Sequence, residues 1–210
     1  MQIKSTPGES PVPAGDRRAA ERTTSVYRPV LIETAEFGGF CLVRNLSPGG
    51  MMGVVYTQFG AEQPVTVQFH PDHVVTGVIV WSKEGRIGTR FNTRIDVDAV
   101  LQNLASKSVG TRVNRAPRLP IEYPAEVEIG WRLRRIRLLD ISQRGMKAVV
   151  NCPMQPGDEL VVRLDGLQPH RAEVRWVEDG VAGLNFILPI GFEDLARWVI
   201  ERQSAQPHSW

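Results

Sequence analysis

Cysteine and long apolar runs are both scarce in this chain. Its 210 residues include only two cysteines, Cys41 and Cys152, which occupy unrelated places in the sequence. They form neither a disulfide framework nor a metal knuckle, so we expect a reduced, cytoplasmic protein. No apolar stretch approaches the roughly 20 residues that a transmembrane helix needs. We therefore expect no membrane insertion.

Recognisable catalytic motifs are also missing. The chain has no P-loop, no nucleophile elbow and no pair of carboxylates that recurs. His70, Asp72 and His73 place two imidazoles beside a carboxylate, but this cluster has no counterpart elsewhere, and Pro71 with Asp72 is typical of a tight turn. The sequence predicts no metal site, no cofactor and no enzymatic activity.

Positive charge is present only in small excess. The formal net charge is +2, which is low for a protein that coats nucleic acid. Aromatic residues interleaved with Lys and Arg, as single-stranded nucleic acids require, are not evident either. Arginine clusters would permit nucleic-acid binding, but we expect no nucleic-acid partner.

The most informative feature that is present is an internal repeat with an offset of 95 residues. The matching pairs are Asn45 with Asp140, Ser47 with Ser142, Gly50 with Gly145, Trp81 with Trp176, Gly88 with Gly183, and Phe91 with Phe186. A register kept over this distance indicates duplication. We expect a disordered tail at 1–15, rich in Pro, Ser and Gly, a first domain at 16–108 and a second at 109–210, closely joined through 106–113.

Short β-rich stretches separated by turn-forming residues recur in both halves. They cover 30–32, 40–44, 53–56, 65–69, 74–81 and 87–91, and then 125–129, 133–139, 146–150, 159–164, 170–177 and 181–186. A helical spacing follows each set, first at Val97, Val100, Leu101 and Leu104, then at Phe192, Leu195, Ala196 and Val199. Because closure removes exposed edges, the sequence predicts a mainly β protein: two tandem six-stranded antiparallel β-barrels, each followed by a C-terminal α-helix.

The repeated polar turn is the candidate binding element. Asn45, Ser47, Gly49 and Gly50 combine an amide, a hydroxyl and glycines that allow a positive φ and a close approach of ligand to backbone. Any hairpin turn uses the same residue types, and duplication would preserve a structural turn as well as a binding one. Neighbouring arginines would clamp an anionic ligand, although a solvated basic linker would have the same composition.

Two motifs in order resemble a known family. Arg18 and Arg22 form R-x-x-x-R, and 23 residues after Arg22 begins the Asn45-Leu-Ser-Pro-Gly-Gly50 sequence, which fits [D/N]-x-S-x-x-G. With the Val-x-Trp ending at Trp81 and the Gly-x-x-Phe ending at Phe91, the chain resembles two tandem PilZ domains of bacteria. PilZ domains are six-stranded barrels with a C-terminal helix, and their ligand is the second messenger cyclic di-GMP.

The resemblance implies a role for each motif residue. Arg18 and Arg22 would contact phosphates and guanine edges, and Arg17 would be the additional arginine that accompanies binding of a stacked ligand dimer. Asn45 and Ser47 would hydrogen-bond a guanine, and the glycines would permit the turn. The implied cyclic di-GMP site is therefore Arg17, Arg18, Arg22, Asn45, Ser47, Gly49 and Gly50.

The second copy departs from the motif. Its loop is complete in Asp140, Ser142 and Gly145, but aligning Arg118 with Arg22 puts Asn114 where the first arginine should stand. Loss of one guanidinium contact costs about tenfold to more than a hundredfold in affinity. We expect these residues, with Arg118, to form a weaker second site or none.

Without a catalytic domain, the resemblance implies a receptor that acts through an unidentified protein partner, as a monomer or a homodimer, in control of motility, exopolysaccharide or biofilm. Segment 16–24 would fold over the ligand and change the orientation of the two domains. The alternative is a PilZ-type protein-interaction module that does not bind the nucleotide.

Overall fold

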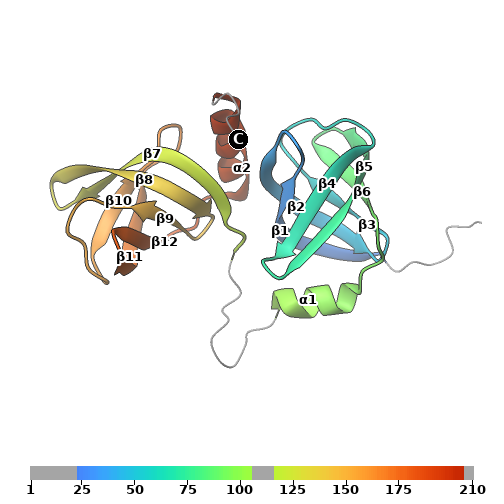
Figure 1. Cartoon of the computed structure of the whole chain (residues 1–210), viewed down its shortest axis with the longest axis horizontal. Helices are drawn as coiled ribbons and strands as arrows, with labels where there is room; N and C mark the ends of the chain where they lie inside the picture. The colour runs from blue at the N-terminus through green and yellow to red at the C-terminus, as the bar shows by residue number, and fades with distance from the viewer. Residues whose placement is uncertain (1–22, 106–115, 206–210) are drawn as a thin grey trace, which may run out of the picture.

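The computed structural model describes residues 23–105 and 116–205, which form two closed β-barrels (Figure 1). The first barrel consists of β1 (Thr24–Glu33), β2 (Gly38–Ser47), β3 (Gly50–Val54), β4 (Gln63–His70), β5 (His73–Lys83) and β6 (Arg86–Phe91), followed by α1 (Val97–Ala105). The second consists of β7 (Leu119–Ile129), β8 (Arg132–Ser142), β9 (Gly145–Val149), β10 (Glu159–Arg163), β11 (His170–Glu178) and β12 (Val181–Phe186), followed by α2 (Phe192–Ala205).

The predicted fold class is confirmed. Each barrel has six antiparallel strands, and the order β1-β2-β3-β6-β5-β4 in the first is repeated as β7-β8-β9-β12-β11-β10 in the second. Strand β4 shows why the chain closes in this way. Val65, Val67 and Phe69 alternate with half-buried residues and point into the core. The turn predicted between His70 and His73 joins β4 to β5.

The first strand of each barrel is longer than predicted. Strand β1 begins at Thr24 rather than at residue 30, and β7 begins at Leu119 rather than at residue 125. The added residues of β1 carry no clear apolar alternation, whereas Leu119, Ile121 and Tyr123 of β7 alternate with exposed residues. In both strands the added residues pair with the end of the next strand, Thr24 with Leu46 and Leu119 with Ile141. Backbone pairing therefore extends β1 and β7 to the repeated polar turns.

Matching β-bulges interrupt the two barrels at equivalent places. The register shifts between Val43 and Asn45 in β2, and between Ile79 and Trp81 in β5. The same shifts recur in the second barrel, before Asp140 and before Trp176. A bulge turns the following side chain relative to the alternation of the strand. In the first barrel these two bulges each precede a residue of the candidate site.

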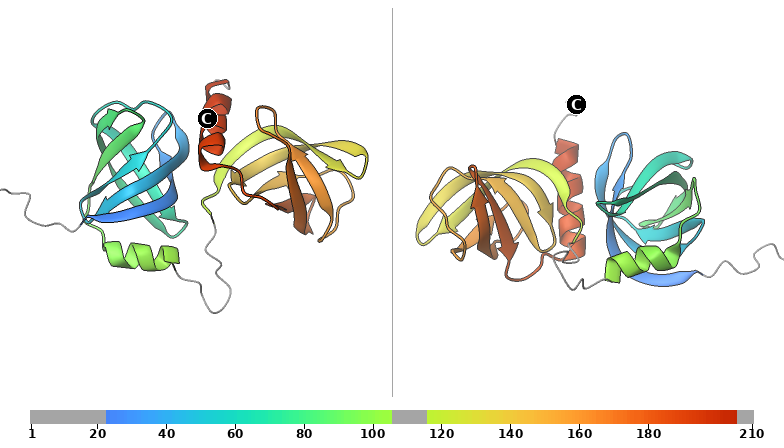
Figure 2. Two further views of the ribbon diagram at one scale, coloured as in Figure 1. Left: turned by 180° about the vertical axis from the view of Figure 1, so that it is seen from behind. Right: turned by 60° about the horizontal axis from the view of Figure 1, so that its bottom comes forward.

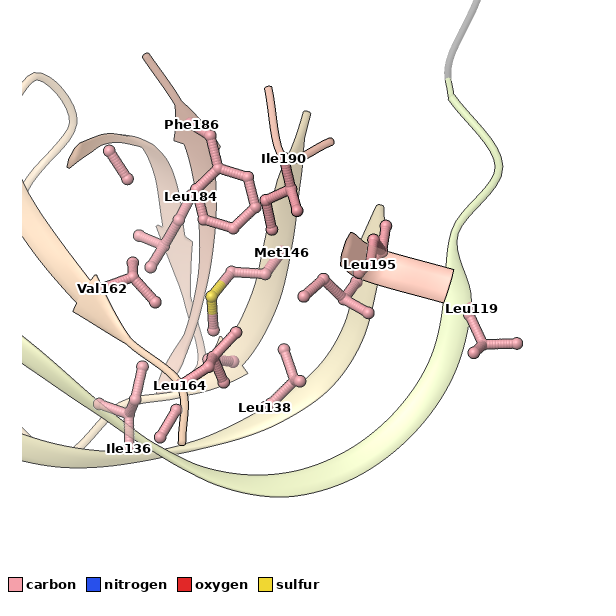
Figure 3. Packing of buried hydrophobic residues seen from close by; sticks show 14 of the residues in the cluster. Leu119, Ile136, Leu138, Met146, Val162, Leu164, Leu184, Phe186, Ile190 and Leu195 are labelled. Carbon is pink, nitrogen blue, oxygen red and sulfur yellow. The ribbon is translucent and has the colours of Figure 1, made fainter. Parts of the chain in front are cut away.

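Each helix covers its own barrel, and α2 also contacts the other one. Asp96 caps α1 by accepting a hydrogen bond from the Ala99 amide at 3.0 Å. Leu195 of α2 points toward Met146 and Ile190 in the second core (Figure 3). Trp198, which is fully buried, donates its indole N–H to the Asp165 carbonyl at 2.7 Å, so this helix docks firmly on its barrel.

Helix α2 lies between the two barrels (Figures 1 and 2). Its Phe192 ring packs edge-on against Phe40 of β2, with ring centroids 6.4 Å apart, and lies 6.2 Å from Tyr56. Near the end of the helix, Gln203 Nε2 donates to the Gly38 carbonyl oxygen at 2.6 Å, and the Gly38 amide donates to Oε1 at 3.4 Å. The second barrel's helix therefore holds the outer face of β2.

None of the helices in the described ranges is both long and apolar enough to cross a bilayer. The predicted linker 106–113 and the predicted tail 1–15 lie outside the described residues, so the domain boundaries stay predictions.

Candidate functional site

A row of register partners crosses five strands on the outside of the first barrel. Ser25 of β1 pairs with Asn45, Asn45 with Met52, Met52 with Gly88, and Gly88 with Trp81. The neighbours of these residues along the strands, such as Leu46 and Ile87, are buried in the core. The row therefore brings Asn45 and Trp81, 36 residues apart in sequence, to the same outer face.

A hollow of about 430 Å³ lies over this row. It collects the four predicted loop residues of the motif, and also contains residues that the sequence did not assign to the site. Its lining is Thr23, Asn45, Ser47, Gly49, Gly50, Met51, Met52, Val80, Trp81, Gly88, Thr89 and Arg90. A volume in this range is typical of ligand sites.

Asn45 offers the hollow a polar side chain that is unpaired among the described residues. Its side chain is half-buried, and its amide makes no hydrogen bond with any other residue in the described part of the chain. An asparagine amide provides two N–H donors and one carbonyl acceptor. Asn45 is thus equipped to pair with the edge of a planar heterocycle.

Ser47 has a structural function in the turn. Its hydroxyl donates to the carbonyl oxygen of Gly50 at 3.1 Å, and Ser142 donates in the same way to Gly145 at 3.0 Å. With its proton used in this bond, the Ser47 hydroxyl has lone pairs available to accept a hydrogen bond. The predicted contact of Ser47 with a guanine stays a prediction.

One of the two reasons expected for glycine at the end of the motif, a positive φ, is wrong. Neither Gly50 nor Gly145 has a positive φ. A Cβ atom on Gly50 would overlap with the backbone carbonyl oxygen of Thr89 on β6, and one on Gly145 would overlap with that of Leu184 on β12. Glycine is required here because two neighbouring strands approach closely, independently of any ligand.

Trp81 forms one wall of the hollow. Its side chain is 41% exposed, and its indole lies on Gly88, where an added Cβ would overlap with Nε1. Trp176 lies on Gly183 in the same way in the second barrel. Both tryptophans therefore lie at the rim of their barrels, and an aromatic face of Trp81 is open to a ligand.

Arg90 is a cation of the hollow that the sequence reasoning missed. It lies opposite Gly50 in the register of β3 and β6. Its guanidinium is 3.6 Å from the carboxylate of Glu62, and both side chains are well exposed, so this ion pair is weak. The signal available in the sequence was the position of Arg90 within the Gly-x-x-Phe segment.

The predicted arginines Arg17, Arg18 and Arg22 lie outside the described residues. The described part of the chain begins at Thr23, which lines the hollow, and Thr24 then pairs with Leu46. The arginine motif therefore precedes, in sequence, a residue at the edge of the hollow.

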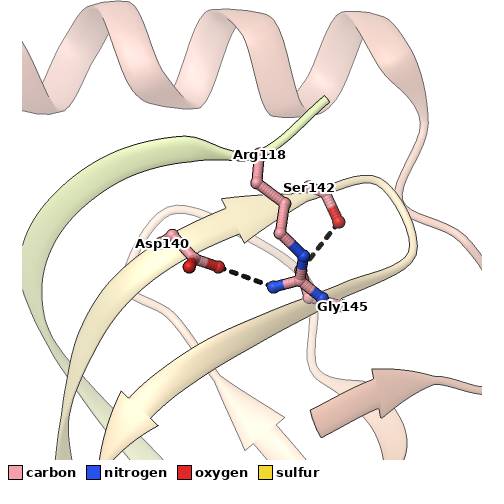
Figure 4. A network of polar contacts seen from close by, with 4 residues as sticks. All are labelled: Arg118, Asp140, Ser142 and Gly145. Atoms are coloured by element: carbon pink, nitrogen blue, oxygen red, sulfur yellow. Dashed lines mark hydrogen bonds and ion pairs between the residues drawn. The ribbon is translucent and has the colours of Figure 1, made fainter. Parts of the chain in front are cut away.

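The equivalent face of the second barrel is charged and internally paired. Asp140 accepts a hydrogen bond from Arg118 Nη1 at 2.6 Å, which closes an ion pair over the turn (Figure 4). Asp140 is also the register partner of Lys147, which takes the place of Met52 in the first barrel, and Arg144 takes the place of Gly49. A ligand at this face would have to displace these charges.

The strand register also corrects one alignment. Leu119 pairs with Ile141 as Thr24 pairs with Leu46, so the two strands match at the 95-residue offset. Arg118 is then equivalent to Thr23, not to Arg22 as the sequence spacing predicted, and Pro117 takes the place of Arg22. The second barrel lacks an arginine at that position of the motif.

Comparison with known proteins gives a family match over most of the chain. The model of the PilZ domain family matches residues 16–106 and 113–201. No curated protein matches the chain.

The chain also aligns with solved structures at low identity. The Borreliella burgdorferi PlzA protein in complex with c-di-GMP is 8% identical, with a TM-score of 0.38 over 82% of this chain and 88% of that one. The Bacillus subtilis inhibitor of motility, MotI/DgrA, is 15% identical, with a TM-score of 0.34 over 88% and 100%. Escherichia coli YcgR in complex with c-di-GMP is 13% identical, with a TM-score of 0.34 over 84% and 85%. At these values the likeness carries no argument about ligand or mechanism.

Proposed function

The chain belongs to the PilZ domain family, with two tandem copies, and on that premise we propose that its first barrel is a receptor for cyclic di-GMP. One observation carries the proposal: the motif loop, an open tryptophan and an arginine line a single hollow, directly beyond the arginine motif in sequence.

The chemistry of the hollow fits a guanine dinucleotide. The free amide of Asn45 can donate to and accept from a base edge, and the exposed face of Trp81 can stack on a base. Arg90 adds positive charge at the rim. A guanidinium pairs bidentately with phosphate or with the O6 and N7 edge of guanine. Each part of the ligand therefore has a matching group.

The arginine motif would complete the site from the preceding segment. Arg22 is the residue next to Thr23 in the chain, and Thr23 lines the hollow. We expect Arg18 and Arg22 to contact phosphates and guanine edges, and Arg17 to hold a second ligand molecule when a stacked dimer binds. Charge-assisted hydrogen bonds of this kind contribute about 1.5–3 kcal/mol each.

The second barrel is proposed to bind the dinucleotide weakly or not at all. Its aspartate is already paired with Arg118 at 2.6 Å, and Pro117 stands at the place of Arg22. For this barrel the observations favour the alternative function, a protein-interaction module, since its helix α2 holds the first barrel through Phe192 and Gln203.

Strand β2 offers a route from ligand to partner. Its C-terminal end carries Asn45 and Ser47, and its N-terminal end carries Gly38 and Phe40, which contact α2. We propose that ligand binding changes how β2 meets α2, and so changes the orientation of the two barrels toward a protein partner. Control of motility, exopolysaccharide or biofilm would follow from that contact. Identical small-angle scattering profiles with and without ligand would contradict this step.

Isothermal titration of the full chain with cyclic di-GMP tests the proposal. We expect one or two ligands per chain with micromolar affinity or tighter, and no comparable heat with GMP. Arg22→Ala should weaken binding by about tenfold or more, because it removes a charge-assisted contact, whereas Arg118→Ala should leave binding nearly unchanged. Absence of heat at several temperatures, or tight binding by Arg22→Ala, would refute the receptor function.

A further inference from the structure

The turn that joins β7 to β8 exposes large apolar side chains. Trp131 is 89% exposed, more than any other large apolar residue in the described part of the chain, and nearby Leu133 is 51% exposed. Gly130 has a φ of +60°, as the first position of a two-residue type II′ turn requires, so the hairpin is tight. An exposed tryptophan and a nearby exposed leucine therefore give this tight hairpin an apolar tip.

Positive charge surrounds these apolar residues. Arg132 and Arg134 form no ion pair with another described residue, and Arg135 is 3.9 Å from Glu126, which is a loose contact. The other carboxylate near the tip, Glu128, is already paired with Arg163 at 2.7 Å. The tip is therefore apolar at its end and cationic immediately behind it.

The equivalent hairpin of the first barrel is built for another purpose. Gly38 and Phe40, at the places of Leu133 and Arg135, contact α2 in the interface between the barrels. In the second barrel the corresponding outer face carries the exposed ion pair of Arg135 and Glu126. Such a charged pair is more stable in water than beneath a packed helix. The β7–β8 tip therefore does not repeat the helix-docking face of its counterpart.

We propose that the β7–β8 tip, Gly130 to Arg135, binds the surface of an anionic lipid membrane. Tryptophan favours the interface between headgroups and acyl chains, and arginines near an anionic leaflet attract its headgroups. The order along the tip fits this surface, because Trp131 and Leu133 would enter the interface while Arg132 and Arg134 remain at headgroup level. Binding is peripheral and involves no spanning segment.

Other partners fit the tip less well. A stable protein interface buries about 800 Å² on each partner, which is far more than a convex two-residue turn presents. Nucleic acid would engage the arginines but would leave Leu133 without a role. The turn also lies at the end of the second barrel farthest from the first (Figures 1 and 2), so a membrane contact leaves the candidate ligand hollow accessible.

Vesicle sedimentation with the full chain tests the proposal. We expect the protein to bind vesicles of phosphatidylcholine mixed with phosphatidylglycerol, to bind less as salt is added, and not to bind phosphatidylcholine alone. Trp131→Ala should weaken binding by at least about tenfold, and Arg132→Glu by about thirtyfold, since it changes two charges near the surface. Arg86→Glu is the matched control for Arg132→Glu, because it makes the same change of charge at an exposed residue elsewhere. Leu188→Ala is a control for loss of an exposed apolar side chain away from the tip.

The outcomes separate this proposal from the ligand-binding function. Trp131→Ala and Arg132→Glu should melt as the wild type does and should bind cyclic di-GMP with unchanged affinity, because the tip is exposed and remote from the hollow. No binding to the anionic vesicles, or equal binding by wild type and tip variants, would overturn the proposal. Tip variants that lose binding to an acidic protein or to nucleic acid, but keep their vesicle binding, would also overturn the proposal.

Discussion

Substituting alanine for Gly88 should weaken ligand binding, and the same change at Gly183 should not. In both barrels the new Cβ would overlap with the indole nitrogen of the tryptophan that lies on the glycine, Trp81 or Trp176. Both tryptophans are 41% exposed, so each indole can relieve the overlap by swinging off its barrel. The two variants therefore introduce the same local perturbation.

The expected magnitudes follow from what each indole does. Displacement of a half-exposed ring from the barrel surface should cost on the order of 1 kcal/mol of unfolding free energy in either variant. Base stacking on an aromatic side chain contributes about 1–3 kcal/mol, so Gly88→Ala should also weaken cyclic di-GMP binding by about fivefold to more than a hundredfold. Gly183→Ala should bind as the wild type does, because Trp176 belongs to the face closed by Arg118 and Asp140.

Titration calorimetry and thermal melting on the two variants give the comparison directly. Similar melting temperatures would show that the folded state is equally perturbed, and the difference in affinity would then report the ligand site. Wild-type affinity in Gly88→Ala would refute the assignment of Trp81 to the site. Equal loss of affinity in both variants would refute the assignment of binding to the first barrel.

Three further predictions concern the fold. Phe192→Ala should open the contact with Phe40 and weaken the association of the two barrels by about 2 kcal/mol. The radius of gyration in small-angle scattering should then increase, and an unchanged profile would contradict this prediction. Burial raises the pKa of the Cys41 thiol to about 12, so at neutral pH the native protein should react rapidly with Ellman's reagent at Cys152 alone, and two rapid thiols would be inconsistent with this. Burial lowers the pKa of His170 below its ordinary 6.5, so the unfolded chain binds the proton more readily than the folded chain does. The free energy of unfolding should therefore fall as the pH drops from about 6.5 toward the folded pKa. In denaturant titrations His170→Gln should lack this part of the pH dependence.

The repeat carried most of the information about the fold. Alternating residues such as Val65, Val67 and Phe69 predicted inward-facing strands, and the constant offset predicted that both halves adopt the same barrel. The bridging role of α2 could not be predicted in this way. Phe192 occupies the same place in its helical pattern as Val97 does in α1, and only the packing shows that its ring meets Phe40 of the other barrel.

The loop of the candidate site was predicted, but its full composition was not. Strand alternation alone does not bring Asn45 and Trp81 to the same face, because a bulge precedes each of them and shifts the facing of the side chain. Arg90 joins them only through the pairing of β6 with β3. The one-residue error in the placement of Arg118 arose because the spacing of the arginines alone does not fix the register of β7, which is set by the pairing of Leu119 with Ile141.

The central claim is that cyclic di-GMP binds the first barrel beside Trp81, and indole resonances test it most directly. The chain has five tryptophans, so a nitrogen–proton correlation spectrum contains few side-chain signals, which Trp81→Phe and Trp176→Phe would assign. On titration with cyclic di-GMP, the Trp81 indole signal should shift strongly, while the Trp176 signal should stay in place. A shift of Trp176 without one of Trp81, or no shift of either at saturating ligand, would contradict the claim.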